Sequence, residues 1–120
     1  MARTDRAASI AAQRAATVER VAALARQVDE LAEQQAHTTH DDEHDPEGVT
    51  IGYQRAQLQG LLADARRDVE ALDRAADRLR EGGYGRCATC GGPIAPARLE
   101  ALPAAETCID CAGRRRRTSR

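Results

Sequence analysis

The sequence predicts a mainly α-helical protein: a long antiparallel helical hairpin, of coiled-coil type, followed by a small four-cysteine module. Apolar residues recur at steps of three and four in two long segments, a short polar segment separates these segments, and all 4 cysteines lie in the last third of the chain. The 120 residues include no Phe or Trp and only 2 Tyr, so the chain lacks the large side chains that build a thick globular core. Its many Ala, Leu, Glu and Arg residues favour narrow helical packing instead.

The first helix is expected from about Thr4 to Ala36, a stretch that contains neither Gly nor Pro. Thr4 or Asp5 can cap its start. Its apolar positions step by three and four, the spacing of a coiled-coil seam, at Val21, Leu24, Val28 and Leu31. The same steps continued toward the N-terminus reach Thr17, Arg14 and Ile10, so the seam is predicted to be strong near residue 31 and weak near the start.

The second helix is expected to end at Gly82-Gly83, where a left-handed cap is natural. Asp45-Pro46-Glu47 has the pattern of an N-cap, a first helical proline and a first-turn acid, but residues 48–52 are poor helix formers, so regular helix is expected only from about Tyr53. The seam of this helix is the more regular one, at Leu58, Leu62, Ala65, Val69, Leu72, Ala76 and Leu79.

The two seams match if the chain folds back near residue 41. Leu24 then faces Leu58, and Ile10 faces Leu72. This agreement predicts an antiparallel hairpin over residues 1–81 with an acidic tip at residues 38–48. A three-helix bundle or a dimer remains an alternative, in which the acidic segment is only a solvated connection.

Charge is unevenly distributed along the chain. Residues 1–81 contain 11 Arg and 16 acidic residues, a net charge of −5, whereas residues 82–120 contain 7 Arg and 3 acidic residues, a net charge of +4. No uninterrupted apolar stretch follows the N-terminus, which predicts neither a signal peptide nor a membrane span. We therefore expect a cytoplasmic protein with no membrane contact, in a compartment that keeps thiols reduced.

The four cysteines follow the pattern C-x2-C-x17-C-x2-C, within an expected module at residues 82–113: Cys87, Cys90, Cys108 and Cys111. This spacing is typical of a zinc site, in which four thiolates close the tetrahedral shell and leave no position for substrate. One structural Zn²⁺ is therefore predicted. Two disulfides would require export, and a redox CxxC would not need two copies; an iron–sulfur centre is harder to exclude.

A short helix is expected between the two cysteine pairs, over residues 96–102, because it would begin at Pro96 and end before Pro103. Ile94, Leu99 and Leu102 are expected to form the small core of the module.

The residues from Gly83 to Cys111 resemble the zinc module of the TraR/DksA family of transcription regulators. The resemblance is carried by Gly83-Tyr84-Gly85-x-Cys87-x-x-Cys90-Gly91, Ile94, Arg98-Leu99-Glu100-Ala101-x-Pro103 and Cys108-Ile109-Asp110-Cys111. The hairpin is similar to that family in architecture and not in amino-acid sequence. The resemblance implies a non-enzymatic regulator that binds RNA polymerase directly, inserts its coiled coil into the secondary channel, and has no sequence-specific DNA binding. It also allows the alarmone ppGpp as a ligand.

The resemblance further implies that acidic tip residues approach the catalytic magnesium of the polymerase; the candidates are Asp41, Asp42, Glu43, Asp45 and Glu47. Family tips often show two Asp three apart followed by a small residue. Here Asp42-x-x-Asp45 has that spacing, but Pro46 follows it. If the family is aligned on the Asp-Pro pair instead, Gly48 stands where the second Asp belongs.

Two further features have less specific interpretations. His37, His40 and His44 could form a second metal site or a pH-responsive tip, or be ordinary exposed histidines. The segment 114–120 is expected to be a disordered basic tail without the longer C-terminal helix of larger family members; its Arg114, Arg115, Arg116 and Arg117 could contact phosphates or an acidic protein face. The alternative function is therefore a zinc-stapled nucleic-acid-binding or scaffold protein. No catalytic grouping is evident, so we expect no enzyme activity.

Overall fold

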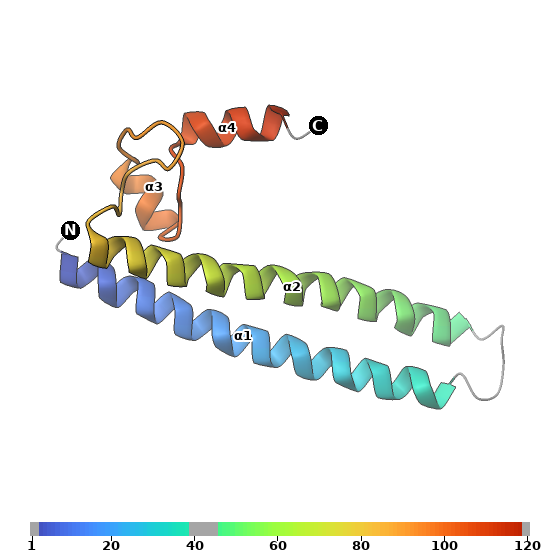
Figure 1. Ribbon diagram of the computed structural model, residues 1–120. Coiled ribbons are helices and arrows are strands. Elements are labelled where there is room, and N and C mark those ends of the chain that lie inside the picture. The colour runs from blue at the N-terminus through green and yellow to red at the C-terminus, as the bar shows by residue number, and fades with distance from the viewer. Residues whose placement is uncertain (1–2, 39–45, 119–120) are drawn as a thin grey trace. The chain divides into compact units, whose positions relative to one another are not determined.

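Four helices make up the regular structure of the residues that the computed structural model describes, 3–38 and 46–118. They are α1 (Arg3–Thr38), α2 (Pro46–Glu81), α3 (Pro96–Ala101) and α4 (Ile109–Thr118). Helices α1 and α2 run antiparallel, side by side (Figure 1). The prediction of a mainly helical hairpin followed by a four-cysteine module is confirmed. Within the described ranges no helix has the length and apolar character needed to cross a membrane.

Helix α2 begins earlier than its composition suggests. It starts at Pro46, so the expected delay to Tyr53 is wrong. Packing compensates for the poor helix propensity of this first part: Ile51 is buried, and the position that a Cβ would take on Gly52 lies 3.1 Å from Nε2 of Gln35 on α1. The helix pair therefore stabilises turns that would be weak in isolation.

Burial along the hairpin follows the predicted seams with one correction. Leu62, Ala65 and Leu72 are buried on α2 as expected. On α1 the buried seam positions are Ile10 and Thr17, whereas the predicted strong positions from Val21 to Leu31 are only half-buried. The predicted weakness near the start is confirmed at Arg14, which is about half exposed. It is wrong at Ile10, which packs in a cluster that Tyr84 and Ala104 of the C-terminal region also cover.

The chain divides into two compact units. The hairpin unit comprises residues Ala15–Val69, and the zinc-module unit comprises Met1–Arg14 with Glu70–Arg120. The ends of both long helices thus pack with the cysteine module. Helix α2 ends at Glu81, where the sequence placed the module boundary, but the compact unit extends beyond that point on both helices.

Ion pairs link α1 to α2 inside each unit. In the hairpin unit Nη2 of Arg20 lies 3.1 Å from Oδ2 of Asp68, and in the zinc-module unit Nε of Arg14 lies 2.6 Å from Oδ1 of Asp73. All four side chains are about half exposed, so each pair contributes at most about 1 kcal/mol. These ion pairs favour the observed alignment of α1 with α2.

Candidate metal centre

The chain leaves α2 through a glycine cap. Gly82 has φ +89°, and the amide of Gly83 donates to the carbonyl of Arg78 at 2.9 Å, which is the bonding of a Schellman motif. The predicted left-handed cap is confirmed at Gly82. A side chain with a Cβ would be strained at this φ, and the turn directs the chain into the cysteine module.

The first cysteine pair lies in a tight knuckle. The amide of Cys87 donates to the carbonyl of Gly92 at 2.8 Å, and the amide of Gly91 donates back to the carbonyl of Cys87 at 2.9 Å. Gly91 has φ +75°, and the Gly92 amide points to Sγ of Cys90 at 3.4 Å. The knuckle therefore turns backbone amides toward sulfur, as a thiolate site requires.

The second pair lies at the start of α4. The amide of Ala112 donates to the carbonyl of Cys108 at 3.0 Å, so Cys108 and Cys111 lie about one helical turn apart. The guanidinium of Arg114 lies 3.4 Å from Sγ of Cys111 and adds a charged donor beside that sulfur.

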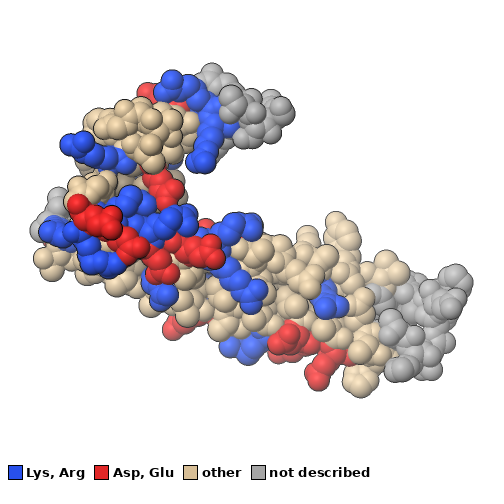
Figure 2. Space-filling model, in the orientation of Figure 1, with Lys and Arg blue, Asp and Glu red and all other residues tan. Residues whose placement is uncertain are grey.

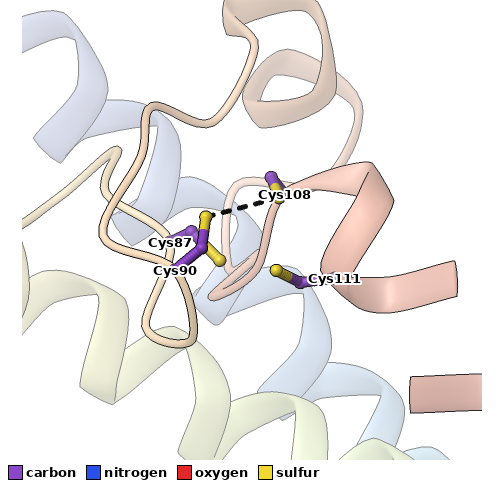
Figure 3. A group of neighbouring side chains, drawn as sticks. All are labelled: Cys87, Cys90, Cys108 and Cys111. Atoms are coloured by element: carbon purple, nitrogen blue, oxygen red, sulfur yellow. Dashed lines mark hydrogen bonds between the residues drawn. The ribbon is translucent and has the colours of Figure 1, made fainter. Parts of the chain in front are cut away.

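The four sulfurs surround a common centre between the knuckle and α4 (Figure 3). All four Sγ atoms lie within 4.8 Å of one another, and those of Cys90 and Cys108 are 3.9 Å apart. A tetrahedral zinc with Zn–S bonds of about 2.3 Å places its sulfurs roughly 3.8 Å apart, so the cluster has the size that zinc needs. Cys87 and Cys111 are buried, Cys108 is half-buried and Cys90 is exposed.

The protonation of the sulfurs also favours a cation. Backbone hydrogen bonds from Cys90 and Cys108 lower the pKa of Cys87 to about 6, while hydrogen bonding to Cys108 and burial raise the pKa of Cys111 to about 12. Four negative charges this close together repel one another, so all four sulfurs are thiolates only when a positive ion compensates them. A soft divalent ion such as Zn²⁺ supplies that charge, and four protein ligands leave no open position. The site fits one structural zinc.

The small core of the module differs from the prediction at one residue. Ile94 and Leu99 are buried with Cys87 and Cys111, as expected, but Leu102 is 53% exposed. Helix α3 ends at Ala101, and Leu102 adopts an extended backbone with φ −132° before Pro103, so its side chain leaves the core. Tyr84 and Ala105 pack against the cluster instead.

Tyr84 joins the cysteine module to the ends of the long helices. Its hydroxyl donates to the carbonyl of Pro103 at 2.8 Å, and the guanidinium of Arg6 on α1 lies 5.8 Å from its ring centre. It also packs against the cluster that contains Ile10 and Leu72. Partial burial raises the pKa of its hydroxyl. The sequence motif that contains Tyr84 indicated a family resemblance but no packing role for this side chain, although it is one of only 2 tyrosines.

Glu106 makes a second link to α2. Its Oε1 accepts hydrogen bonds from Nε of Arg74 at 2.8 Å and Nη1 of Arg78 at 3.1 Å, and the bond from Arg74 is the main reason that its pKa is lowered. The carbonyl of Glu106 accepts from the amide of Ala88 at 2.8 Å. The segment before Cys108 is thus held to both α2 and the first knuckle. No local pattern could reveal this, because the partners are 28 and 32 positions away.

The other predicted site residues are placed less completely. Asp41, Asp42, Glu43, Asp45, His40 and His44 lie outside the described residues. Glu47 belongs to the first turn of α2, and His37 is exposed in the last turn of α1. The tip and its histidines therefore stay predictions.

The basic C-terminal segment is helical where a disordered tail was expected. Helix α4 continues through Thr118 and includes Arg114 to Arg117. The prediction is corrected for residues 114–118. Arginine is a good helix former, and positive charge is favourable near the C-terminal end of a helix, which explains the continuation.

A long helical hairpin joined to a closed four-cysteine site defines the class: a helical-hairpin protein with a structural C4 zinc finger. Residues 82–117 match the family model of the prokaryotic dksA/traR C4-type zinc finger. The module therefore belongs to that zinc-finger family, and the resemblance stated from the sequence is confirmed for it.

One solved structure extends the similarity to the whole fold. The structure of transcription factor DksA2 from Pseudomonas aeruginosa matches with a TM-score of 0.77 at 22% identity, over 98% of this chain and 84% of that chain. An RNA polymerase binding protein and transcriptional regulator from Chlamydia trachomatis has a TM-score of 0.41 at 21% identity, over 79% of this chain and 88% of that one. No curated relative matches the sequence. The chain thus shares the fold of DksA2.

Proposed function

We propose that the protein is a transcription regulator that binds RNA polymerase directly and inserts its helical hairpin into the secondary channel. One observation carries this proposal: a dksA/traR-type zinc finger occurs on a chain that shares the DksA2 fold over 98% of its length. In this proposal the polymerase is cytoplasmic and so is its regulator.

The zinc site has a supporting role in this function. A tetrahedral site with four thiolate ligands has no open position, so it supplies no chemistry and instead stabilises the module at the ends of α1 and α2. The acidic segment between the helices carries the activity. Its carboxylates, Asp42 and Asp45 above all, are oxygen ligands of the kind that hard cations such as Mg²⁺ accept.

Binding to purified core RNA polymerase tests the proposal. Wild type is expected to be retained by immobilised polymerase and to change the output of promoter-dependent transcription in vitro. Asp42→Ala and Asp45→Ala are expected to bind but to lose most of the transcriptional effect. Asp29→Ala, an exposed acid on α1, is the matched control and should behave as wild type.

Two results would contradict the proposal. One is the absence of polymerase binding by the zinc-loaded protein. The other is DNA binding that falls steeply with salt, disappears on deletion of residues 114–120 and ignores the tip substitutions, which would favour a nucleic-acid-binding function. The same assay with and without ppGpp determines whether that nucleotide contributes.

A further inference from the structure

The two halves of α2 differ sharply in charge. Residues 64–81 include 11 charged side chains, whereas residues 46–63 include only two, Glu47 and Arg55. The guanidinium of Arg55 is turned toward α1, where its Nη1 donates to Oε1 of Gln35 at 3.2 Å. In Figure 2 the upper surface of the hairpin is largely tan toward the end where the residues are drawn in grey, while red and blue gather over the opposite end. The neighbouring part of α1, residues 21–38, keeps 4 charged residues.

The half of α2 with little charge exposes large apolar side chains. Val49 is 73% exposed, Tyr53 71% and Leu61 54%, three of the six large apolar side chains that are exposed among the described residues. With Gln57 they follow one another at steps of four, so they lie along one side of the helix. We call Val49, Tyr53, Gln57 and Leu61 the α2 stripe.

A groove of about 570 Å³ opens beside the α2 stripe. Its apolar lining comes from Leu31, Leu58 and Leu61, and Gln54 and Gln57 provide amide donors and acceptors. The lining also includes Asp64, whose carboxylate is paired with Arg67 on the same helix. The groove lies entirely within the hairpin unit.

Gly60 forms a notch in this groove that no internal contact explains. A Cβ at Gly60 would meet nothing within 4 Å, whereas one at Gly52 would meet Gln35. Glycine in the middle of a helix lowers its stability relative to alanine, and a glycine on a surface permits close approach of another molecule. Gly60 thus leaves room for a group from outside the chain.

We propose that the α2 stripe and the Gly60 notch form the face of the hairpin that docks on RNA polymerase, with an apolar polymerase side chain seated over Gly60 between Leu58 and Leu61. This inference rests on the proposed function and adds to it the helix and the side of the hairpin that make contact. A hairpin inserted into a protein channel loses water on its contact face. Unpaired charges there would be costly to desolvate. Burial of apolar side chains is favourable instead, and glutamine amides can form hydrogen bonds with groups of the channel wall.

A second copy of the chain fits this face less well. A stable interface buries about 800 Å² on each partner. Three separated apolar side chains and a glycine notch offer much less than that. A polymerase can add contacts at the acidic tip and elsewhere on the chain, so a small apolar face is sufficient there.

Two substitutions test the docking face by different means, and each has a matched control on α1. Leu61→Glu introduces a charge, and Val18→Glu does the same at an exposed apolar position of α1. Gly60→Leu fills the notch without adding charge, and Ala22→Leu adds the same side chain at an exposed position of α1. Helicity, melting temperature and zinc content verify that each variant is folded.

The binding of zinc-loaded chains to core RNA polymerase is the measured quantity. We expect Leu61→Glu and Gly60→Leu to weaken binding by about tenfold or more, as for residues at the centre of an interface, while both controls stay within about threefold of wild type. A photo-crosslinker in place of Tyr53 should react with polymerase, and one in place of Ala22 should not.

The outcomes separate this inference from the proposed function. If wild type binds and all four variants bind equally, the docking face is wrong although the proposed function stands. If wild type does not bind polymerase, both fail. If wild type is a dimer that Leu61→Glu dissociates without weakening polymerase binding, the face belongs to a second copy and the inference is overturned.

Discussion

The hairpin unit and the zinc-module unit are stabilised in different ways. The hairpin unit relies on repetitive packing of Ala, Leu and Val along two helices, with Leu62 and Ala65 among its few buried residues. The zinc-module unit relies on four sulfurs, a small cluster around Ile94 and Leu99, and individual links through Tyr84 and Glu106. Single substitutions should therefore have graded effects in the first unit and abrupt effects in the second.

The largest effect is expected from loss of a zinc ligand. Cys108→Ser should lower the zinc content well below one per chain and melt the module, because structural zinc contributes on the order of 10 kcal/mol to modules of this kind. The hairpin unit should keep most of its helicity, since all four cysteines belong to the zinc-module unit. Zinc analysis and circular dichroism provide the measurement. Unchanged metal content in Cys108→Ser would refute the four-ligand site.

A smaller effect is expected at the link between the module and the long helices. Tyr84→Ala removes a ring that packs on both clusters and should destabilise the zinc-module unit by about 3 kcal/mol, in the range of large-to-small core substitutions. Tyr84→Phe loses only the bond to Pro103 and should cost about 1 kcal/mol. Thermal melts of zinc-loaded protein distinguish the two. Equal stabilities for both variants would show that the ring does not join the clusters.

A pH-dependent effect is expected at Glu106. Hydrogen bonds from Arg74 first, and charge from Arg74 and Arg78, lower the pKa of this carboxyl below its ordinary value of 4.5. The ionised form is thus favoured by folding, so its contribution is present above pH 4.5 and is lost as pH falls through the lowered pKa. Glu106→Gln should cost about 1 kcal/mol at pH 7, and less as the pH falls below 4.5.

Carbon NMR of the Glu106 carboxyl measures the pKa of this group directly, with Arg74→Gln as the control. The midpoint of Glu106 should lie below 4.5 in wild type and rise in Arg74→Gln. A midpoint that does not respond to Arg74→Gln would show that the contact is absent in solution. Zinc content is followed in parallel, because acid also protonates thiolate ligands.

The smallest effects are expected from two glycines of α2. Gly60→Ala should stabilise the hairpin by up to about 1 kcal/mol, because a methyl group there meets nothing and alanine is the better helix former. Gly52→Ala should stabilise the hairpin less, because the added Cβ would lie 3.1 Å from Nε2 of the Gln35 amide. Denaturant melts of the two variants provide the comparison. A larger gain at Gly52 would contradict the packing described between α1 and α2.

Much of the fold and of the metal centre could be predicted because their signals are local. The seam positions Leu62, Ala65 and Leu72 and the cap at Gly82 follow from spacing within a few residues of the chain. The four cysteine ligands follow from two CxxC pairs that are separated by 17 residues. The errors had two sources. The early start of α2 is accompanied by packing of a distant segment, at Gln35 of α1, whereas Leu102 is exposed for a local reason, because α3 ends at Ala101 directly before it.

The sequence by itself determined the two long helices and the four-cysteine site, because helix periodicity and metal-ligand spacing can be read from the chain without its tertiary contacts. The matched seams favoured an antiparallel pairing, and the tertiary structure decided for it against a bundle of three helices. Only the tertiary structure decided how the module is held, through Tyr84 on Pro103 and Arg6 and through Glu106 on Arg74 and Arg78. It also decided that Ile10, at the predicted weak end of the seam, is among the most buried residues. Such contacts join residues that are tens of positions apart. The burial of a side chain such as Ile10 therefore depends on which distant residues pack over it.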